Sequence, residues 1–169
     1  MNIRKATQQD IPSLNKLVNS AYRGDSSKVG WTTEADLLDG IRTSEASLKE
    51  MIDGSNAVML VAEEDDQLKG CVYLQQQDDA LYLGMLTVNP QLQGQGIGAN
   101  LMRAAEQRAK DIGCKKIKMT VITTRKELIA YYERKGYADT GERKPFPNDP
   151  KFGIPKQPLQ FMVMEKMLA

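Results

Sequence analysis

The sequence predicts a mixed α/β domain whose central sheet is mainly antiparallel and is flanked by helices. Three apolar runs, at residues 57–62, 70–74 and 81–88, follow one another across short acidic turns, as in an antiparallel meander. A glycine-rich stretch at 93–98 opens into an amphipathic helix, and a strand pattern at 115–122 follows it, which implies a parallel crossover. Because no repeat, low-complexity tract or composition break interrupts the chain, residues 1–169 are expected to form one domain.

Helices dominate the expected structure before the meander. Residues 2–6 suggest a first strand, and Asp10 can cap a helix that carries Pro12 in its first turn. Residues 33–41 and 45–52 are predicted to be two helical pieces, the second ended by Gly54. These two pieces form an atypical helical insert before the sheet.

The turns and breaks of the meander come from short polar residues and one glycine. Asp65-Asp66 and Asp78-Asp79 lie between strand-like runs, where they favour turns over a paired-carboxylate catalytic site. Gly84 interrupts the third run, and a glycine inside a strand indicates a bulge or a close approach of another backbone. The third strand is therefore expected to be distorted.

The stretch from Gln93 to Gly98, Gln-Gly-Gln-Gly-Ile-Gly, is the most informative feature of the chain. Glycines allow a tight turn and a close approach to a ligand, and the first amides of the following helix point outward at the positive end of its dipole. This combination predicts a binding site for a phosphate-bearing cofactor. The helix buries Ile97, Leu101 and Ala105 and ends at Gly113.

The last third of the chain completes the sheet. Residues 115–122 alternate as a strand with one wet face, and residues 125–135 form a short helix stopped by Gly136. Residues 137–143 and 161–168 are expected to be closing strands around a loop at 144–158 that is rich in proline and glycine.

Composition excludes several function classes. The net charge of +1 gives no broad field for nucleic acid or anionic lipid, and no apolar run is long enough to span a membrane, so we expect a soluble cytoplasmic protein. The chain has no histidine, which removes Ser-His and Cys-His pairs and histidine metal sites, and no metal is expected. Cys71 and Cys114 suit buried free thiols. The methionines at 162, 164 and 167 suit core packing or a subunit contact in a homodimer.

A dinucleotide site is the competing interpretation of the glycine run. That fingerprint requires Gly-x-Gly-x-x-Gly near a first strand and an acidic residue about 20 positions later. Here the run follows a meander beyond the middle of the chain, and position 118 is Lys118. The dinucleotide interpretation is therefore disfavoured, as is a purely structural glycine turn.

Two segments together resemble the Gcn5-related N-acetyltransferases (GNAT). LTVNPQLQGQGIGANLM, residues 86–102, is similar to the family's strand, Gln/Arg-x-x-Gly-x-Gly/Ala loop and helix. ELIAYYERKGY, residues 127–137, is similar to its later helix with the aromatic-Tyr-Glu-x-x-Gly-aromatic ending. The resemblance covers about residues 57–143, so the insert at 22–54 and the late loop are expected to carry substrate choice.

The resemblance implies a GNAT fold, binding of acetyl-coenzyme A as cosubstrate, and transfer of its acetyl group to an amine. It implies that Tyr132 is the general acid that protonates the departing thiolate, although Tyr132 could instead merely pack. The pantetheine arm would pair beside Leu86, Thr87 and Val88 like an added strand. Main-chain amides would hold the pyrophosphate along a stretch made of Gln93, Gly94, Gln95, Gly96, Ile97, Gly98 and Ala99.

Further expectations concern the acceptor. Glu34 is a candidate general base, although its charge can equally stabilise a helix N-terminus. Arg125 is a candidate contact for the cofactor phosphates, and the alternative is that it is a solvated surface charge. Glu34, Asp36 and Asp39 hint at a cationic amine, with Trp31 and Tyr22 as apolar walls. We expect a small-molecule amine; a non-catalytic acyl-coenzyme A binding or sensing module and a protein or peptide N-acetyltransferase are the alternatives.

Overall fold

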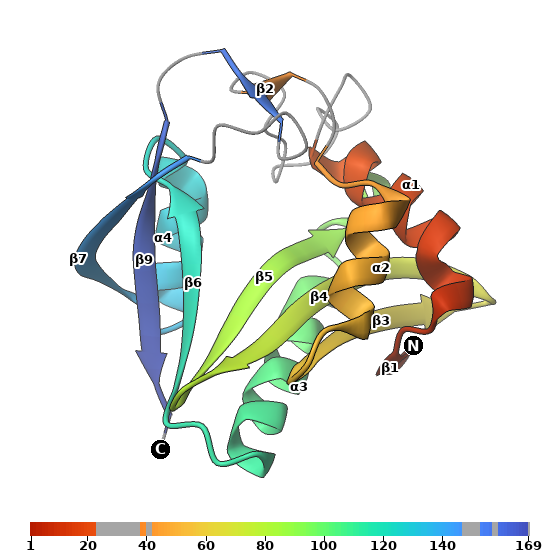
Figure 1. The fold of residues 1–169 in the computed structure, drawn as a ribbon, viewed down its shortest axis with the longest axis horizontal. Coiled ribbons are helices and arrows are strands. Elements are labelled where there is room, and N and C mark those ends of the chain that lie inside the picture. Colours follow the sequence, from red (N-terminus) through yellow and green to blue (C-terminus); the bar gives the residue numbers. More distant parts are fainter. Residues whose placement is uncertain (23–37, 40–41, 147–152, 157–158, 169) are drawn as a thin grey trace.

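The computed structural model describes residues 1–22, 38–39, 42–146, 153–156 and 159–168. Seven strands form one sheet in the order β1-β3-β4-β5-β6-β9-β7, and two short strands, β2 and β8, form a separate ribbon (Figure 1). The strands are β1 Asn2–Lys5, β2 Leu38–Asp39, β3 Ala57–Glu64, β4 Gln67–Gln77, β5 Ala80–Val88, β6 Lys116–Ile122, β7 Ala138–Pro145, β8 Ile154–Pro155 and β9 Gln160–Met167. Within the large sheet only β5 and β6 are parallel. The predicted mixed, mainly antiparallel sheet is confirmed.

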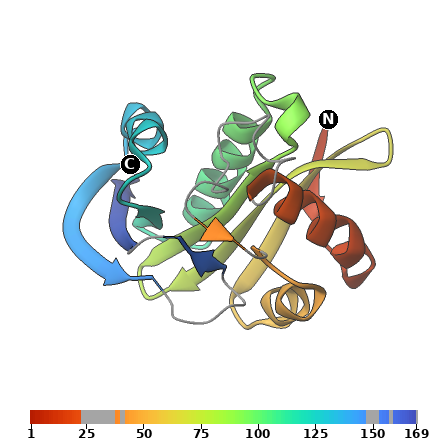
Figure 2. The ribbon, with the colours of Figure 1, turned by 90° about the horizontal axis from the view of Figure 1, so that it is seen from above.

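Helices cover both faces of the sheet (Figure 2). On one face lie α1 Ile11–Tyr22 and α2 Glu45–Asp53, and on the other lie α3 Ile97–Asp111 and α4 Lys126–Arg134. Leu60 of β3 packs into the core beneath α3, whereas its neighbour Val61 packs into the core beneath α1 and α2. Because successive side chains of a strand point to opposite faces, β3 needs an unbroken apolar run to fill both cores.

The start of the first helix differs from the prediction that Asp10 is its N-cap. A 3-10 turn, η1 Gln8–Asp10, precedes α1, and Thr7 is its N-cap. Asp10 instead accepts a hydrogen bond from the main-chain N–H of Thr7 at 2.7 Å and two from the Arg4 guanidinium at 2.9 Å. The helical segment therefore begins earlier than predicted, because Asp10 serves as the third residue of a capping box.

The insert contains one of its two predicted helices. α2 begins after Ser44, whose Oγ accepts from the main-chain N–H of Ser47 at 3.2 Å, and it ends before Gly54 as expected. The helix predicted for residues 33–41 is wrong at Leu38–Asp39, which form β2 and pair with Ile154–Pro155 of β8. The rest of that prediction lies outside the described residues. Strand pairing with the late loop overrides the local helical pattern.

The distortion predicted for the third strand of the meander is present, one residue beyond Gly84. The β4–β5 register shifts between Cys71 and Tyr73, and Met85 has a positive φ of 52°. The parallel ladder between β5 and β6 ends at Tyr82 and Lys118, after which the two strands diverge (Figure 1). The remaining half of β5 therefore presents an edge toward an opening in the sheet.

Other sequence predictions are also confirmed. Asp65, Asp66 and Asp78 have positive φ in the two meander turns, and Gly113 and Gly136 follow the ends of α3 and α4. Both cysteines are buried free thiols, and burial raises the pKa of Cys71 to about 12. Within the described part of the chain, no helix combines the length and apolarity needed to cross a membrane.

The three methionines of β9 differ in their burial. Met162 and Met164 are buried in the core, so they pack as expected for a central strand. Met167, at the end of β9, is exposed.

Candidate active site

Two cavities meet where β5 and β6 diverge. One has a volume of about 380 Å³ and the other about 290 Å³, and both are lined by Leu86, Leu128 and Tyr132. Leu86 lies on the free part of β5, whereas Leu128 and Tyr132 come from α4. The two cavities therefore adjoin at the opening in the sheet, with Tyr132 at their junction.

The smaller cavity is built around the glycine-rich loop. Of the residues predicted to bind the cofactor, it is lined by Leu86, Val88, Gln93, Gly94, Gly96, Ile97, Gly98 and Ala99. Gly94 and Gly96 have φ of 86° and 82°, and a Cβ added to either would meet no heavy atom within 4 Å. The main chain at these two glycines is thus open to a ligand.

The first turn of α3 directs its free amides toward this loop. Gly96 is the N-cap, and its carbonyl oxygen accepts from Asn100 N at 3.0 Å. The amides of Ile97, Gly98 and Ala99 have no acceptor within the helix, since the first four N–H groups of any α-helix lack one. Together with the helix dipole, these donors fit a phosphate or pyrophosphate group.

Gly70 of β4 allows α3 to lie this close to the sheet, a role that the sequence analysis missed. A Cβ on Gly70 would lie 2.6 Å from the carbonyl oxygen of Thr87 and 3.0 Å from Cγ2 of Ile97. Such separations are far below van der Waals contact, so any larger residue would push the loop and helix away.

Three residues predicted to bind the cofactor are not among those that line the smaller cavity. The Thr87 side chain is fully buried, and its hydroxyl donates to the main-chain oxygen of Met85 at 2.9 Å. Gln95 lines neither cavity, and Arg125 lines the larger cavity instead of the one at the glycine loop. Lys135 does line the smaller cavity and was missed, because a lysine near a helix end usually indicates only surface charge.

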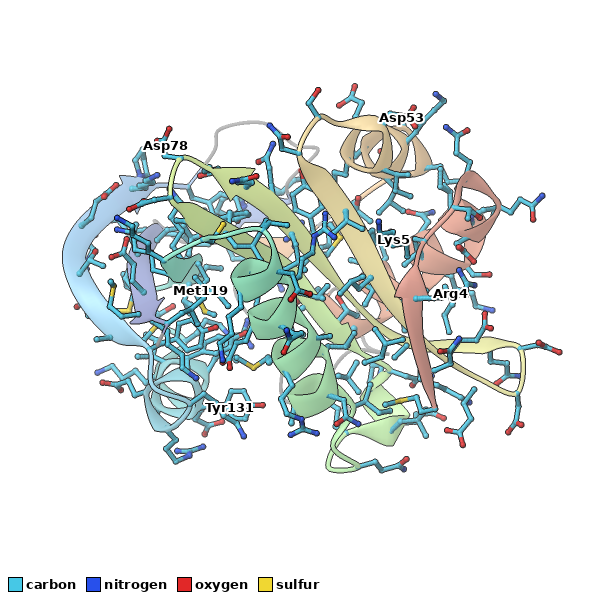
Figure 3. All side chains as sticks on the ribbon, turned by 90° about the horizontal axis from the view of Figure 1, so that it is seen from below. Arg4, Lys5, Asp53, Asp78, Met119 and Tyr131 are labelled. Carbon is cyan, nitrogen blue, oxygen red and sulfur yellow. The ribbon has the colours of Figure 1, made fainter. Side chains whose placement is uncertain are left out.

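Tyr132 is distinguished from the neighbouring Tyr131 by its environment. Tyr132 is buried between Tyr131 and Tyr137, with ring centroids at 5.5 and 6.0 Å. Tyr131 points toward α3 (Figure 3), where its hydroxyl lies 3.9 Å from Sδ of Met102, and it lines only the smaller cavity. Burial, together with Tyr22 and the two flanking tyrosines, raises the pKa of Tyr132, while the charge of Arg125 opposes the increase. The phenol therefore stays protonated at neutral pH.

The larger cavity lies between α1, α2, β5 and β6. Tyr22 lines it, and its hydroxyl donates to the carbonyl oxygen of Leu86 on the free part of β5. Arg42 and Thr43, which the sequence analysis did not single out, line the same cavity, and the Arg42 guanidinium carbon lies 5.4 Å from the Tyr22 ring centroid.

The predicted acidic cluster cannot be compared with this cavity. Glu34, Asp36 and Trp31 lie outside the described residues. Asp39 belongs to β2, and its side chain is likewise outside the description.

Known proteins resemble this chain in sequence and in fold. A sequence model of the family described as acetyltransferase (GNAT) domain matches residues 34–148. An uncharacterised N-acetyltransferase, YhfO, of Bacillus subtilis is 29% identical over 148 residues, which cover 83% of this chain and 93% of that protein.

Among solved structures, the fold is similar to that of the ribosomal-protein-alanine N-acetyltransferase of Brucella melitensis, with a TM-score of 0.74, 21% identity and coverage of 99% and 100% of the two chains. It is also similar to the PaiA N-acetyltransferase of Thermoplasma acidophilum in complex with coenzyme A, with a TM-score of 0.69, 18% identity and coverage of 99% and 98%. The family match spans more than half of the sequence and includes both cavities' central elements. The chain belongs to the acetyltransferase (GNAT) family and is an acetyl-coenzyme A-dependent acyltransferase.

Proposed function

We propose that this acetyltransferase transfers the acetyl group to the primary amine of a small molecule by direct attack, with Tyr132 as general acid. The observation that carries the proposal is the position of the Tyr132 side chain, which lines both the glycine-loop cavity and the larger cavity. A group at that junction can reach a thioester that enters from one side and an amine that enters from the other. Holding the two reactants together at this junction makes the reaction between them effectively intramolecular.

The smaller cavity would hold the phosphates and the arm of the cofactor. The pyrophosphate would accept hydrogen bonds from the amides between Gln93 and Ala99, and Lys135 would add positive charge on the same wall. The free edge of β5 from Leu86 to Val88 would pair with the amides of pantetheine, as an added strand does. Arg125 lines the other cavity, so we assign it to the acceptor side instead of to the phosphates.

Tyr132 would donate its proton to sulfur as the carbon–sulfur bond breaks. The bound thioester supplies an activated acyl carbon, and the amine nitrogen forms the new bond to that carbon. The amine nitrogen loses one proton and the sulfur gains one, so the protons balance and Tyr132 can return to its neutral form after each turnover. Because its raised pKa disfavours a lasting phenolate, the nearby positive charge of Arg125 would help during the transfer.

Two further groups would assist the same step. A main-chain amide of the divergent strand, for which Leu86 is our candidate, would stabilise the oxyanion that develops on the acyl oxygen. Glu34 remains our candidate for removing the proton of a substrate ammonium; it lies outside the described residues, so kinetics of Glu34→Gln would test it.

The size of the larger cavity and the segments near it support a small acceptor. Strand β2 of the insert pairs with strand β8 of the late loop, and this ribbon lies over the gap between β5 and β6 in both ribbon views (Figure 1, Figure 2). A cavity of about 380 Å³ suits a single small molecule. An extended peptide would need an open groove.

The test compares Tyr132→Phe with Tyr131→Phe by measuring coenzyme A release with a panel of primary amines. Removing the hydroxyl of Tyr132 should lower kcat by about 10²–10⁴-fold, the usual contribution of a general acid, while the KM for acetyl-coenzyme A changes little. Tyr131→Phe removes the same atom from the adjacent ring outside the junction and should change kcat by less than about threefold.

Equal rates for wild type and Tyr132→Phe would refute the acid role. Acetylation confined to peptide N-termini would refute the small-molecule acceptor and leave the acid role intact. Binding of acetyl-coenzyme A without turnover of any amine would refute the proposed reaction.

A further inference from the structure

The larger cavity has an uneven set of charges. Among the described residues that line it, Arg42 and Arg125 are the charged ones, and none is an aspartate or glutamate. Arg42 lies on the side of α1 and α2, whereas Arg125 is the residue before α4 and affects Tyr132 electrostatically. A second positive charge on the acceptor would therefore be repelled from both walls, and a negative charge would be attracted.

Aromatic side chains gather in the same cavity. The chain has only ten aromatic residues, yet six line this space, namely Tyr22, Tyr73, Tyr82, Tyr132, Phe146 and Phe161. Several belong to elements far apart in the sequence, so chain proximity does not explain the grouping. Aromatic and apolar walls with a few polar groups are typical of sites that bind an organic molecule through its apolar body.

Arg42 and Thr43 form one polar corner of this cavity, which we call the Arg42 corner. Asn19 of α1 fixes its main chain, because Oδ1 accepts from Arg42 N at 2.7 Å and from Thr43 N at 3.1 Å, and Nδ2 donates to the oxygen of Thr43 at 3.0 Å. The corner is thus held rigidly against α1.

The Thr43 hydroxyl has hydrogen-bonding capacity to spare. Thr43 is only 2% exposed, and among the described residues its Oγ1 has no hydrogen-bond partner. A buried hydroxyl that forms no hydrogen bond is costly, so it indicates a missing polar partner. Arg42, the preceding residue, lines the same cavity, and a guanidinium and a hydroxyl that both donate to one ligand are favourable for binding a carboxylate.

We propose that the acceptor is a primary amine that carries a carboxylate and an apolar, ring-sized body, with the carboxylate held at the Arg42 corner. This inference rests on the proposed function. The apolar body lies among the aromatic walls, and the amine points toward the junction at Tyr132. Tyr22 connects the two ends of this arrangement, because the Arg42 guanidinium carbon lies 5.4 Å from its ring centroid and Tyr22 lines the same cavity as Tyr132.

The experiment uses matched acceptors that differ only in the carboxylate. L-Phenylalanine is compared with 2-phenylethylamine, and 4-(aminomethyl)benzoate with benzylamine, so that two separations of amine and carboxylate are sampled; spermidine is included as a cationic acceptor. The carboxylate member of at least one pair should show a kcat/KM about ten- to a hundredfold higher than its partner, as expected for a charged hydrogen bond.

Variants locate the effect. Arg42→Gln should lower that ratio of kcat/KM values by about ten- to a hundredfold, and Arg42→Lys should lower it less, because it keeps the charge but loses the forked geometry. Lys49→Gln is the matched control, since Lys49 is an exposed residue of α2 that pairs with Asp53 and its loss removes the same charge. It should leave the ratio unchanged.

Calorimetric titration of the same acceptors into the coenzyme A-bound protein separates this inference from the proposed function. Tighter binding of the carboxylate member without turnover would refute the reaction but support the Arg42 corner. Turnover with no preference for the carboxylate in either pair, or with spermidine as the best acceptor, would refute the corner and leave the reaction standing.

Discussion

Gly96→Ala tests whether the main chain of the glycine-rich loop holds phosphate. Gly96 has φ of 82°, and a Cβ there would contact no protein atom within 4 Å. The new methyl group would therefore cause no clash inside the protein. It would stand on the wall of the smaller cavity, where a ligand has to approach the first amides of α3.

The magnitudes follow from this geometry, and α3 supplies its own control. Gly113 at the other end of α3 has φ of 80° and is equally open, so Gly113→Ala carries the same backbone strain. Both variants should lose about 1 kcal/mol of unfolding free energy, since an L-residue in the left-handed region is strained but loses less chain entropy on folding. Only Gly96→Ala should also lose one charged hydrogen bond to phosphate, about 1.5–3 kcal/mol, which weakens binding about ten- to a hundredfold.

The assay is calorimetric titration with coenzyme A and with pantetheine, which lacks the pyrophosphate, alongside urea unfolding of each variant. Gly96→Ala should weaken coenzyme A binding relative to Gly113→Ala but change pantetheine binding little. Equal affinities of the two variants for coenzyme A, at similar stability, would show that the loop does not hold the pyrophosphate.

Two further predictions concern stability. Gly70→Ala should lower the free energy of unfolding by about 2 kcal/mol or more, because its Cβ would lie 2.6 Å from a main-chain oxygen. Gly54→Ala, whose nearest contact would be 3.4 Å, should lower it clearly less in urea unfolding. Equal losses in the two variants would contradict the packing argument. Asp10→Asn should lower the free energy of unfolding by about 1–2 kcal/mol at pH 7. The Arg4 guanidinium holds the pKa of Asp10 below its usual range, so the native carboxylate stabilises the fold above about pH 4. This stabilisation is lost as the pH falls through the lowered pKa. The difference between Asp10→Asn and wild type should shrink in acid, and a difference that stays constant down to pH 2 would exclude the ion pair as its cause.

The sequence predicted most reliably what short stretches of chain decide by themselves. Asp65 and Asp66 adopt the left-handed turn conformation that their short polar side chains favour, and the glycine loop opens a helix because glycines supply the positive φ. These are local conformational preferences. They require no knowledge of what lies across the sheet.

Predictions failed where a distant segment decides the conformation or the role. Leu38–Asp39 form a strand only because Ile154–Pro155 lie beside them. Asp10 is held by two hydrogen bonds from the guanidinium of Arg4 on β1. Neither partner could be identified from periodicity, which describes one segment at a time.

The site shows the same division. Periodicity does not distinguish the adjacent residues Tyr131 and Tyr132, and only the family resemblance singled out Tyr132. In the structure, the α4 helix turns one toward α3 and the other into the junction of the cavities. Arg42 was missed for a related reason, since its possible role becomes visible only from its contacts with Tyr22 and Asn19. Three-dimensional packing, not residue type, selects these side chains.

The two cavities suggest how cofactor binding and acceptor choice can be separated in one fold. The smaller cavity is built from β5, the glycine loop, α3 and α4, and the free main-chain amides at the start of α3 are among its polar groups. The larger cavity is lined by side chains from α1, α2 and the segment around Phe146, so it can change by substitution without disturbing the loop. Because Leu86 and Tyr132 border both, changes at these two positions should alter catalysis with every acceptor, whereas changes at the Arg42 corner should alter which acceptor is chosen.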